Sequence, residues 1–241
     1  MNTTNPNNQN AIKEFSRFSK DYNSYNQIQA QVAKQLINKL PSRNYKIIAD
    51  IGCGTGALYD RLVSREIFFG RLVALDASEQ MLLLHPSDQR VVTQYFDFNE
   101  PGSFSSIKDK FDLVLSSSAL QWSRDLGWTI SQLAHIGDNF YGAIFTSNTF
   151  KTLHETASVA SPIYTPEEIK KAFDKSYKNT QYEIYRYKLY FDSKKDLFNY
   201  IKKSGVSGGE QKLSYKQTKT LMREFPLDYL EFEVVFIEAS N

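Results

Sequence analysis

The chain of 241 residues has 41% hydrophobic and 23% charged residues and a formal net charge of +2, a composition typical of globular proteins. No apolar run reaches the 18 residues that a membrane span requires, and the near-neutral charge gives little support to a nucleic-acid-binding role. The length suits one α/β domain with a substantial core. We therefore expect no membrane and no nucleic acid among the partners.

Cysteine and histidine are too scarce for the common structural sites. Cys53 is the single cysteine, so an internal disulfide is impossible, and the three histidines form no HxxxH pattern. We therefore expect no metal. The first ten residues, MNTTNPNNQN, lack the basic and then apolar order of a secretion signal, which predicts a cytoplasmic protein.

The elements alternate along the first 150 residues. Residues 15–40 place apolar side chains at helical spacing and predict one or two helices before Pro41. Strand-like runs follow at residues 46–51, 71–76, 91–96, 111–118 and 142–148, with helical patterns between several of them. This alternation predicts an α/β fold with a doubly wound, Rossmann-like and mainly parallel sheet that has helices on both faces.

The pattern changes after Lys151. Residues 165–173 begin with a Thr cap, Pro in the first turn and early acids, which predicts a helix start. A strand at 181–192, a helix at 193–205 and a last strand at 228–240 are expected to complete the sheet. We predict a single domain, 1–241, with N-terminal helices (1–45), a cofactor-binding core (46–150), and a last part (151–241) that adds an antiparallel strand near the C-terminus and helices for substrate or partner.

A glycine-rich loop joins the first predicted strand to a helix in "IIADIGCGTGALYDRL", residues 47–62. Gly52, Gly54 and Gly56 give GxGxG, and Gly52, Gly54 and Ala57 also satisfy the relaxed dinucleotide pattern GxGxxG/A. Such loops let the backbone approach a nucleotide-shaped ligand closely. The glycines alone do not distinguish a dinucleotide from S-adenosylmethionine.

Acids at the ends of three strands favour a cationic ligand. Asp50 lies just before the loop, where it would repel a diphosphate and attract a positive group. Asp76 ends the second strand and suits ribose hydroxyls in either ligand. Asp97 follows the third strand, where it can accept a hydrogen bond from an adenine amino group, and Phe98 supplies apolar surface beside it.

Three acids at successive strand ends, followed by the strand "FDLVLSSSAL", resemble the class I S-adenosylmethionine-dependent methyltransferases over residues 46–148. Outside this core, "FSRFSKDYNSYNQIQ", "SSSALQW", "TLHE" and "LFNYIKKSGV" resemble the malonyl-acyl-carrier-protein O-methyltransferases of biotin synthesis. Nearly the whole chain is covered by this second resemblance. One departure is "HIGDNFYGA", which stands where that family has a KPGG-like turn before the fifth strand.

The resemblance implies methylation of the free carboxylate of malonyl-acyl carrier protein, or of malonyl-coenzyme A, with S-adenosylmethionine as cofactor and S-adenosylhomocysteine as product. A carboxylate with a pKa of about 4 is ionised at neutral pH, so no residue is expected to act as acid or base. Two other readings stay open: methylation of another small carboxylic acid or a quinone-like substrate, and cofactor binding without turnover.

The resemblance also implies roles for individual residues. Tyr22 matches an aromatic that the family places over the cofactor. Ser116, at the end of the fourth strand, is expected to contact the cofactor. The remaining expected cofactor contacts are Asp50, Gly52, Gly54, Gly56, Asp76, Asp97 and Phe98. Substrate contacts are expected from Gln121, Trp122, Asn148 and His154, with Tyr22, Trp122 and His154 as the positioning residues. A basic cluster would dock the acidic carrier protein on a monomer, namely Lys194, Lys195, Lys202 and Lys203.

Overall fold

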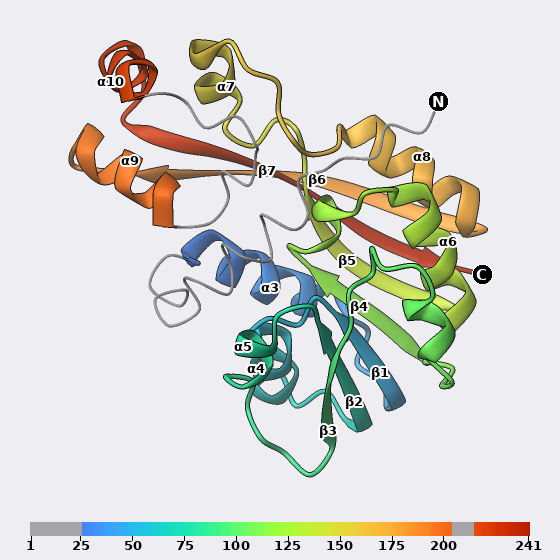
Figure 1. Ribbon diagram of the computed structural model, residues 1–241. Helices are drawn as coiled ribbons and strands as arrows, with labels where there is room; N and C mark the ends of the chain where they lie inside the picture. Colours follow the sequence, from blue (N-terminus) through green and yellow to red (C-terminus); the bar gives the residue numbers. More distant parts are fainter. Residues whose placement is uncertain (1–25, 204–214) are drawn as a thin grey trace.

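The computed structural model describes residues 26–203 and 215–241, whose strands form one seven-stranded sheet in the order β3-β2-β1-β4-β5-β7-β6 (Figure 1). The strands are β1 (Tyr45–Ile51), β2 (Phe69–Asp76), β3 (Val91–Tyr95), β4 (Leu113–Ser117), β5 (Asn139–Phe145), β6 (Asn179–Tyr190) and β7 (Tyr229–Ser240). Strands β1 to β5 pair in parallel, and β7 pairs antiparallel with both β5 and β6. This confirms the predicted mainly parallel sheet with an antiparallel strand near the C-terminus.

Helices cover both faces of the sheet. On one face α3 (Gln27–Lys39) and α4 (Ala57–Ser64) bury Leu36 and Leu62 against sheet residues such as Leu72. On the other face α6 (Leu126–Ile136) and α8 (Pro166–Ser176) bury Ile130 and Phe173. The other helical segments are α5 (Glu79–Leu82), η1 (Ser103–Ser106), η2 (Leu120–Trp122), α7 (Lys151–Ala157), α9 (Lys194–Lys203) and α10 (Tyr215–Glu224). None of the helices in these described ranges is long and apolar enough to cross a membrane.

The central strands are apolar on both sides because both of their faces are covered. In β1, Ile48 joins the core beneath α3 and α4, whereas Ala49 and Ile51 join the core beneath α6 and α8. All three are fully buried. A parallel strand between two helical layers therefore reads as a nearly continuous apolar run, which is why the sequence located it well.

Two predicted boundaries had different outcomes. The helix start at Thr165 is confirmed: Thr165 and Glu168 form a reciprocal capping box, with Pro166 in the first turn. The fifth strand, expected at 142–148, lies three residues earlier at β5. Gly142 is inside this strand, where a Cβ atom would lie 2.4 Å from the Phe140 ring, so the glycine permits close packing and does not mark the start of the strand.

The strand order reverses between β1 and β4, with β2 and β3 on one side of β1 and β5 on the far side of β4. In open α/β sheets the carboxyl ends of the strands diverge at such a point and leave a crevice for a ligand. The glycine loop between β1 and α4 begins there. The part of the predicted N-terminal helices that precedes residue 26 lies outside the described residues.

Candidate functional site

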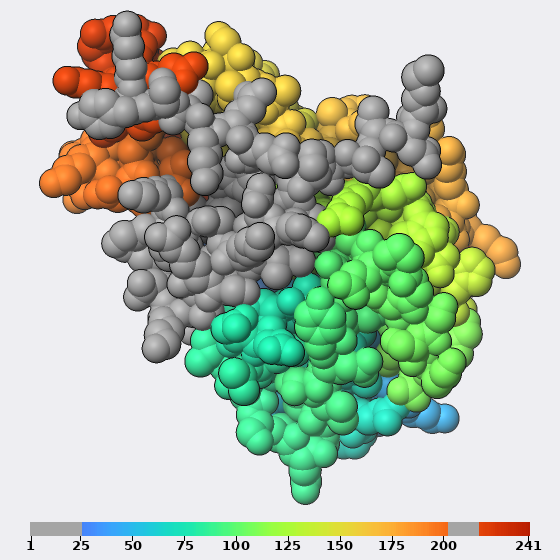
Figure 2. Space-filling model, in the orientation of Figure 1, coloured from blue at the N-terminus to red at the C-terminus, as the bar shows by residue number. Residues whose placement is uncertain are grey.

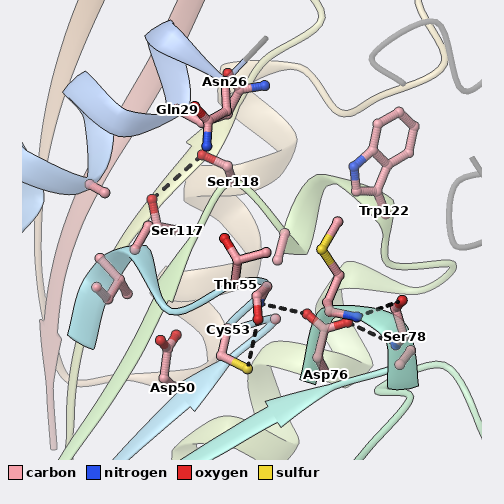
Figure 3. Close-up of a pocket in the computed structure, with 18 of the residues that line it drawn as sticks. Asn26, Gln29, Asp50, Cys53, Thr55, Asp76, Ser78, Ser117, Ser118 and Trp122 are labelled. Carbon is pink, nitrogen blue, oxygen red and sulfur yellow. Dashed lines mark hydrogen bonds between the residues drawn. The ribbon is translucent and has the colours of Figure 1, made fainter. Parts of the chain in front are cut away.

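A cavity opens at the carboxyl ends of β1, β2 and β4 (Figure 3). Its walls come from the first turn of α3, the glycine loop, the loops after β2 and β3, and the segment between β4 and η2. The empty volume is about 970 Å³ including space open to solvent, a size that suits a small-molecule ligand. The polar residues that line it project from several different elements toward one space.

The glycine loop forms one wall. Gly52 has φ +72°, and a Cβ atom there would lie 2.3 Å from the Cβ of Ala119, so the residue permits the loop after β4 to approach. Gly54 has φ +53° and no heavy atom within 4 Å of the Cβ position. Gly54 therefore leaves open space inside the cavity, which a ligand can occupy at close range to the backbone.

Gly56, which was expected to contact the cofactor, lies where the glycine loop meets α4. It has φ +90° and precedes α4, and a Cβ atom there would lie 2.5 Å from Pro86 Cδ and 3.1 Å from His85 Nε2. It is not among the residues that line the cavity. The glycine is needed because the loop after α5 packs tightly against the start of α4.

Asp50 is the most unusual group in the site. Its side chain is completely buried, and neither carboxylate oxygen has a hydrogen-bond partner among the described residues. Burial, together with the neighbouring Asp76 carboxylate, raises the pKa of Asp50 to about 8. A buried carboxylate without a donor is costly, so the cavity is suited to a ligand that brings a positive charge or a hydrogen-bond donor to Asp50.

Asp76 is held in one orientation by the backbone. Its Oδ2 accepts a hydrogen bond from the Gly54 N–H at 2.9 Å, and its Oδ1 accepts one from the Ser78 N–H at 2.8 Å. Burial raises the pKa of Asp76, although these backbone donors act in the opposite direction. Asp76 also lines the cavity, and a carboxylate has about four lone-pair sites, so the group can still accept a hydrogen bond from a ribose hydroxyl.

The third acid, Asp97, lies in the turn after β3. It is 7% exposed, and its Oδ1 accepts a hydrogen bond from the Asn99 N–H at 2.8 Å. Phe96 and Phe98 line the cavity on either side of it. Phe98 was expected in the site and Phe96 was not, although both residues flank the same acid in "FDF".

At the end of β4, Ser116 and the two serines that follow it have different surroundings. Ser116 is 1% exposed, and its Oγ donates a hydrogen bond to the Ile51 carbonyl at 2.8 Å, which ties β4 to β1. Ser117 and Ser118 line the cavity, and Ser118 has φ +60°. The Ser116 hydroxyl is thus used within the sheet, and the cavity lining begins one residue later; its expected contact with the cofactor stays a prediction.

Trp122 and Gln121, the two residues singled out in the ALQW segment, have different surroundings. Trp122 lines the cavity, and its ring stands on the opposite side from α3 (Figure 3). Gln121 does not line it, because its Nε2 donates a hydrogen bond to the Ser118 carbonyl at 2.7 Å. Its buried Oε1 has no partner among the described residues, and its expected contact with substrate stays a prediction.

Two residues of α3 were missed by sequence analysis. Asn26, the N-cap of α3, and Gln29, in its first turn, line the cavity (Figure 3). The buried Oε1 of Gln29 has no partner among the described residues. The available signal was that Asn26, Gln27 and Gln29 place polar side chains around the buried Ile28 where the helix begins. Tyr22, which was expected to cover the cofactor, lies outside the described residues.

Asn148 and His154 lie away from the cavity lining. The Asn148 Nδ2 donates a hydrogen bond at 2.7 Å to Glu233, a buried carboxylate of β7 that also accepts hydrogen bonds from Thr146 and Arg186. His154 lies on α7, where burial lowers the pKa of its ring. Asn148 thus links the chain after β5 to β7, and the buried Nδ1 of His154 has no partner among the described residues. Their expected contact with substrate stays a prediction.

The proposed docking lysines also differ from one another. The Lys194 Nζ donates hydrogen bonds to the carbonyl oxygens of Phe225 and Leu227, so it stabilises the chain after α10, whereas Lys195 is exposed. Lys202 and Lys203 belong to α9, but their side chains lie outside the described structure. Figure 2 shows α9 and α10, in orange and red, at one corner of the molecule.

The cavity has a distinctive charge. Its lining residues include Asp50, Asp76 and Asp97 but no Lys, Arg or His from the described chain. The single cysteine, Cys53, is buried there, and burial raises its thiol pKa. No cluster of three or more metal-ligating side chains occurs in the described ranges. The residues fit an adenosine-containing cation and disfavour a diphosphate, because like charges would face each other in a poorly hydrated space.

Comparisons with known proteins agree with this geometry. A family model described as a methyltransferase domain matches residues 49–136. The chain is 29% identical over 243 residues to a malonyl-[acyl-carrier protein] O-methyltransferase of Priestia megaterium, covering 88% of this chain and 86% of that protein. It is 30% identical over 104 residues to a trans-aconitate 2-methyltransferase of Deinococcus radiodurans, covering 43% and 38%.

The fold also matches solved structures. The YcgJ protein of Bacillus subtilis superposes with a TM-score of 0.63 at 13% identity, covering 88% of this chain and 98% of that one. The sheet, the acidic cavity and the matching family model point the same way. Residues 49–136 therefore resemble a methyltransferase domain, and the described chain shares the fold of the solved structure to which it is similar.

Proposed function

We propose that the protein methylates the free carboxylate of malonyl-acyl carrier protein, an early step of biotin synthesis. The observation that carries this proposal is the similarity, over 88% of the chain, to a protein named for that reaction. The motifs "SSSALQW" and "TLHE" lie within it. The alternative substrate with support is a free polycarboxylic acid, because the chain is also similar, over 104 residues, to a protein named trans-aconitate 2-methyltransferase.

The proposed cofactor contacts follow from the charges and hydrogen-bonding groups of the cavity. S-adenosylmethionine supplies an electrophilic methyl group on a positively charged sulfur. Asp76 is oriented to receive the ribose hydroxyls, and Asp97 with Phe96 and Phe98 would hold the adenine. The unpartnered oxygens of Asp50 favour the positive end of the ligand, and Gly52 and Gly54 permit close approach of the backbone.

The reaction requires no acid or base from the protein. A malonyl carboxylate is already ionised at neutral pH, which agrees with a cavity that has no Lys, Arg or His among its described lining residues. The contribution of the protein would be orientation and exclusion of water, and alignment of two reactants is worth roughly 7–11 kcal/mol at best. We expect Trp122 to line the part of the cavity where the methyl donor and the carboxylate meet.

The carrier protein would dock outside the cavity. Acyl carrier proteins are acidic, and the chain between residues 186 and 223 is rich in Lys and Arg. Lys195 is exposed and suited to steer such a partner, whereas the Lys194 ammonium is held by two backbone carbonyl groups. We propose docking at the α9 corner, with Lys195→Glu slowing turnover at low salt and Lys194→Glu also lowering stability.

A product assay tests the function. The protein is incubated with S-adenosylmethionine and, in separate reactions, malonyl-acyl carrier protein, malonyl-coenzyme A and trans-aconitate. The proposal predicts malonyl methyl ester and S-adenosylhomocysteine, with the carrier-bound substrate turned over fastest. Faster methylation of trans-aconitate would replace the proposed substrate, and cofactor binding without any methylated product would favour a non-catalytic protein.

A further inference from the structure

The side-chain amide of Asn99 joins the turn that carries Asp97 to the segment that carries Trp122. Its Nδ2 donates a hydrogen bond to the Trp122 carbonyl at 3.4 Å, and its Oδ1 accepts one from the Arg124 N–H at 2.7 Å. One amide thus pairs with the backbone on both sides of Ser123, as a neighbouring strand would. The segment after η2 is thereby fixed to the loop after β3.

The same segment is held from its other side. The Tyr164 hydroxyl donates a hydrogen bond to the Ser123 carbonyl at 2.8 Å, and the Ser123 hydroxyl pairs with that of Thr129 at 2.8 Å. Ser123 itself is 1% exposed. Trp122 therefore belongs to a segment whose backbone is fixed at three successive residues, and Asn99 makes its contacts from the turn that carries the lining residue Asp97.

The turn that carries Asn99 does not depend on its side chain. The Asn99 backbone N–H donates to Asp97 Oδ1 at 2.8 Å, and the Glu100 N–H donates to the Asp97 carbonyl at 3.0 Å. Both hydrogen bonds use backbone N–H groups that a substitution at position 99 retains. Substitution of Asn99 can therefore release the Trp122 segment while Asp97 stays in place.

We propose that Asn99 is a positioning residue for methyl transfer. From the turn that carries Asp97, its side chain fixes the backbone of the segment that places Trp122 in the cavity lining. The proposal rests on the proposed function insofar as the cavity binds S-adenosylmethionine. A residue of this kind affects alignment in the reaction more than affinity for the cofactor, because its hydrogen bonds go to the protein backbone and not to the ligand.

Two variants separate the parts of the contact. Asn99→Ala removes both hydrogen bonds, and Asn99→Asp keeps an acceptor for the Arg124 N–H but places an oxygen opposite the Trp122 carbonyl. The matched control is Asn139→Ala, which removes an amide-to-carbonyl hydrogen bond of 3.1 Å to Asp112 at the opposite end of the sheet. All variants are made in the full chain.

Three measurements are made on each variant. Calorimetry gives the affinity for S-adenosylhomocysteine, and the malonyl-acyl carrier protein assay gives kcat and KM. Acrylamide quenching reports the exposure of Trp122 in a Trp128→Phe background, because the chain has only two tryptophans. The Trp128 ring packs edge-on against Phe104 at 5.5 Å, so a phenylalanine retains an aromatic contact there.

The expected results differ for the two sites. In both Asn99 variants we expect the affinity for S-adenosylhomocysteine to change less than threefold, kcat to fall roughly tenfold or more, and Trp122 quenching to rise about twofold. Asn139→Ala should leave all three unchanged. Unchanged kcat and quenching in Asn99→Ala, with cofactor binding intact, would overturn the positioning role alone. No S-adenosylhomocysteine binding by the unaltered protein would overturn both proposals.

Discussion

The Asp76 carboxylate accepts a hydrogen bond from the Gly54 N–H at 2.9 Å, so the acid at the end of β2 and the open part of the glycine loop form one unit. The second oxygen of the carboxylate is held by the Ser78 N–H. The loop thus orients the acid before any ligand arrives. A side chain that is already ordered loses less entropy when it binds.

Substitution of Asp76 should weaken cofactor binding strongly. In Asp76→Asn, the amide NH₂ must face the N–H of either Gly54 or Ser78, and one charge-assisted hydrogen bond to the ribose is lost. Loss of about 1.5–3 kcal/mol corresponds to roughly 10- to 100-fold lower affinity for S-adenosylhomocysteine, measured by calorimetry. Asp88→Asn is the control, since its Oδ1 also accepts from an N–H two residues later, at 2.8 Å. Equal affinity in the two variants would contradict the role of Asp76.

Gly54→Ala should block the cavity at a small cost in stability. Both Gly54 and Gly102 have positive φ and no atom within 4 Å of the Cβ position, but only Gly54 lines the cavity. An alanine at either position costs about 1–2 kcal/mol of backbone strain, visible as similar shifts in Tm. Only Gly54→Ala should also lower the affinity for S-adenosylhomocysteine, by roughly tenfold. If Gly102→Ala weakens binding equally, the steric account of Gly54 is wrong.

Cofactor affinity should rise with pH. The pKa of Asp50 is raised to about 8 because the carboxyl is buried and faces Asp76, so the free protein holds a proton there at pH 7. A cationic ligand favours the ionised form, and its binding should release that proton. Affinity for S-adenosylmethionine should therefore increase between pH 6 and 8 and level off above, by at most about tenfold per pH unit. Calorimetry in buffers of different ionisation enthalpy counts the released protons.

Asp50→Asn provides the control for this pH dependence. The variant should bind more weakly, release no proton and show a nearly flat affinity over the same range. The free energy of unfolding should change with pH in the opposite direction to the cofactor affinity. Between about pH 4 and 8 the folded state holds the Asp50 proton and the unfolded chain does not. The contribution of Asp50 to the free energy of unfolding therefore falls as the pH rises through that window. A proton count of zero in the unaltered protein would contradict the assignment.

Asn148→Ala should affect stability and not substrate binding. Its Nδ2 donates to Glu233, whose other partners include Thr146 and the exposed Arg186. Removing one donor from a buried carboxylate should lower the free energy of unfolding by about 1–3 kcal/mol, measured by denaturant titration. We expect KM for the methyl acceptor to stay within about twofold. A tenfold rise in KM without a stability loss would instead support the substrate contact of Asn148.

The sequence predicted the parts of the site that follow from strand ends. Asp50, Asp76 and Asp97 each close a strand-like run, and parallel strands bring such ends to one edge of a sheet. It did not predict which way a side chain turns after the last strand residue. Ser116 points to β1 and Ser117 to the cavity, a difference of one residue that composition cannot reveal.

Longer-range contacts account for the other differences. Asn148 is occupied by Glu233, 85 residues later in the chain, and only the pairing of β5 with β7 brings them together. Asn26 and Gln29 reach the cavity because α3 packs across the sheet near β4 and β5. Helical periodicity identifies the buried face of α3, but not which polar residues at its end meet another element.

Calorimetry of the full chain with S-adenosylhomocysteine and with NAD⁺ tests the central claim most directly. The account predicts saturable binding of S-adenosylhomocysteine at one site per chain and no saturable heat with NAD⁺, because the cavity lining includes three acids, Asp50, Asp76 and Asp97, and no Lys, Arg or His from the described residues. Saturable binding of NAD⁺, or no binding of S-adenosylhomocysteine by the folded protein, would contradict it.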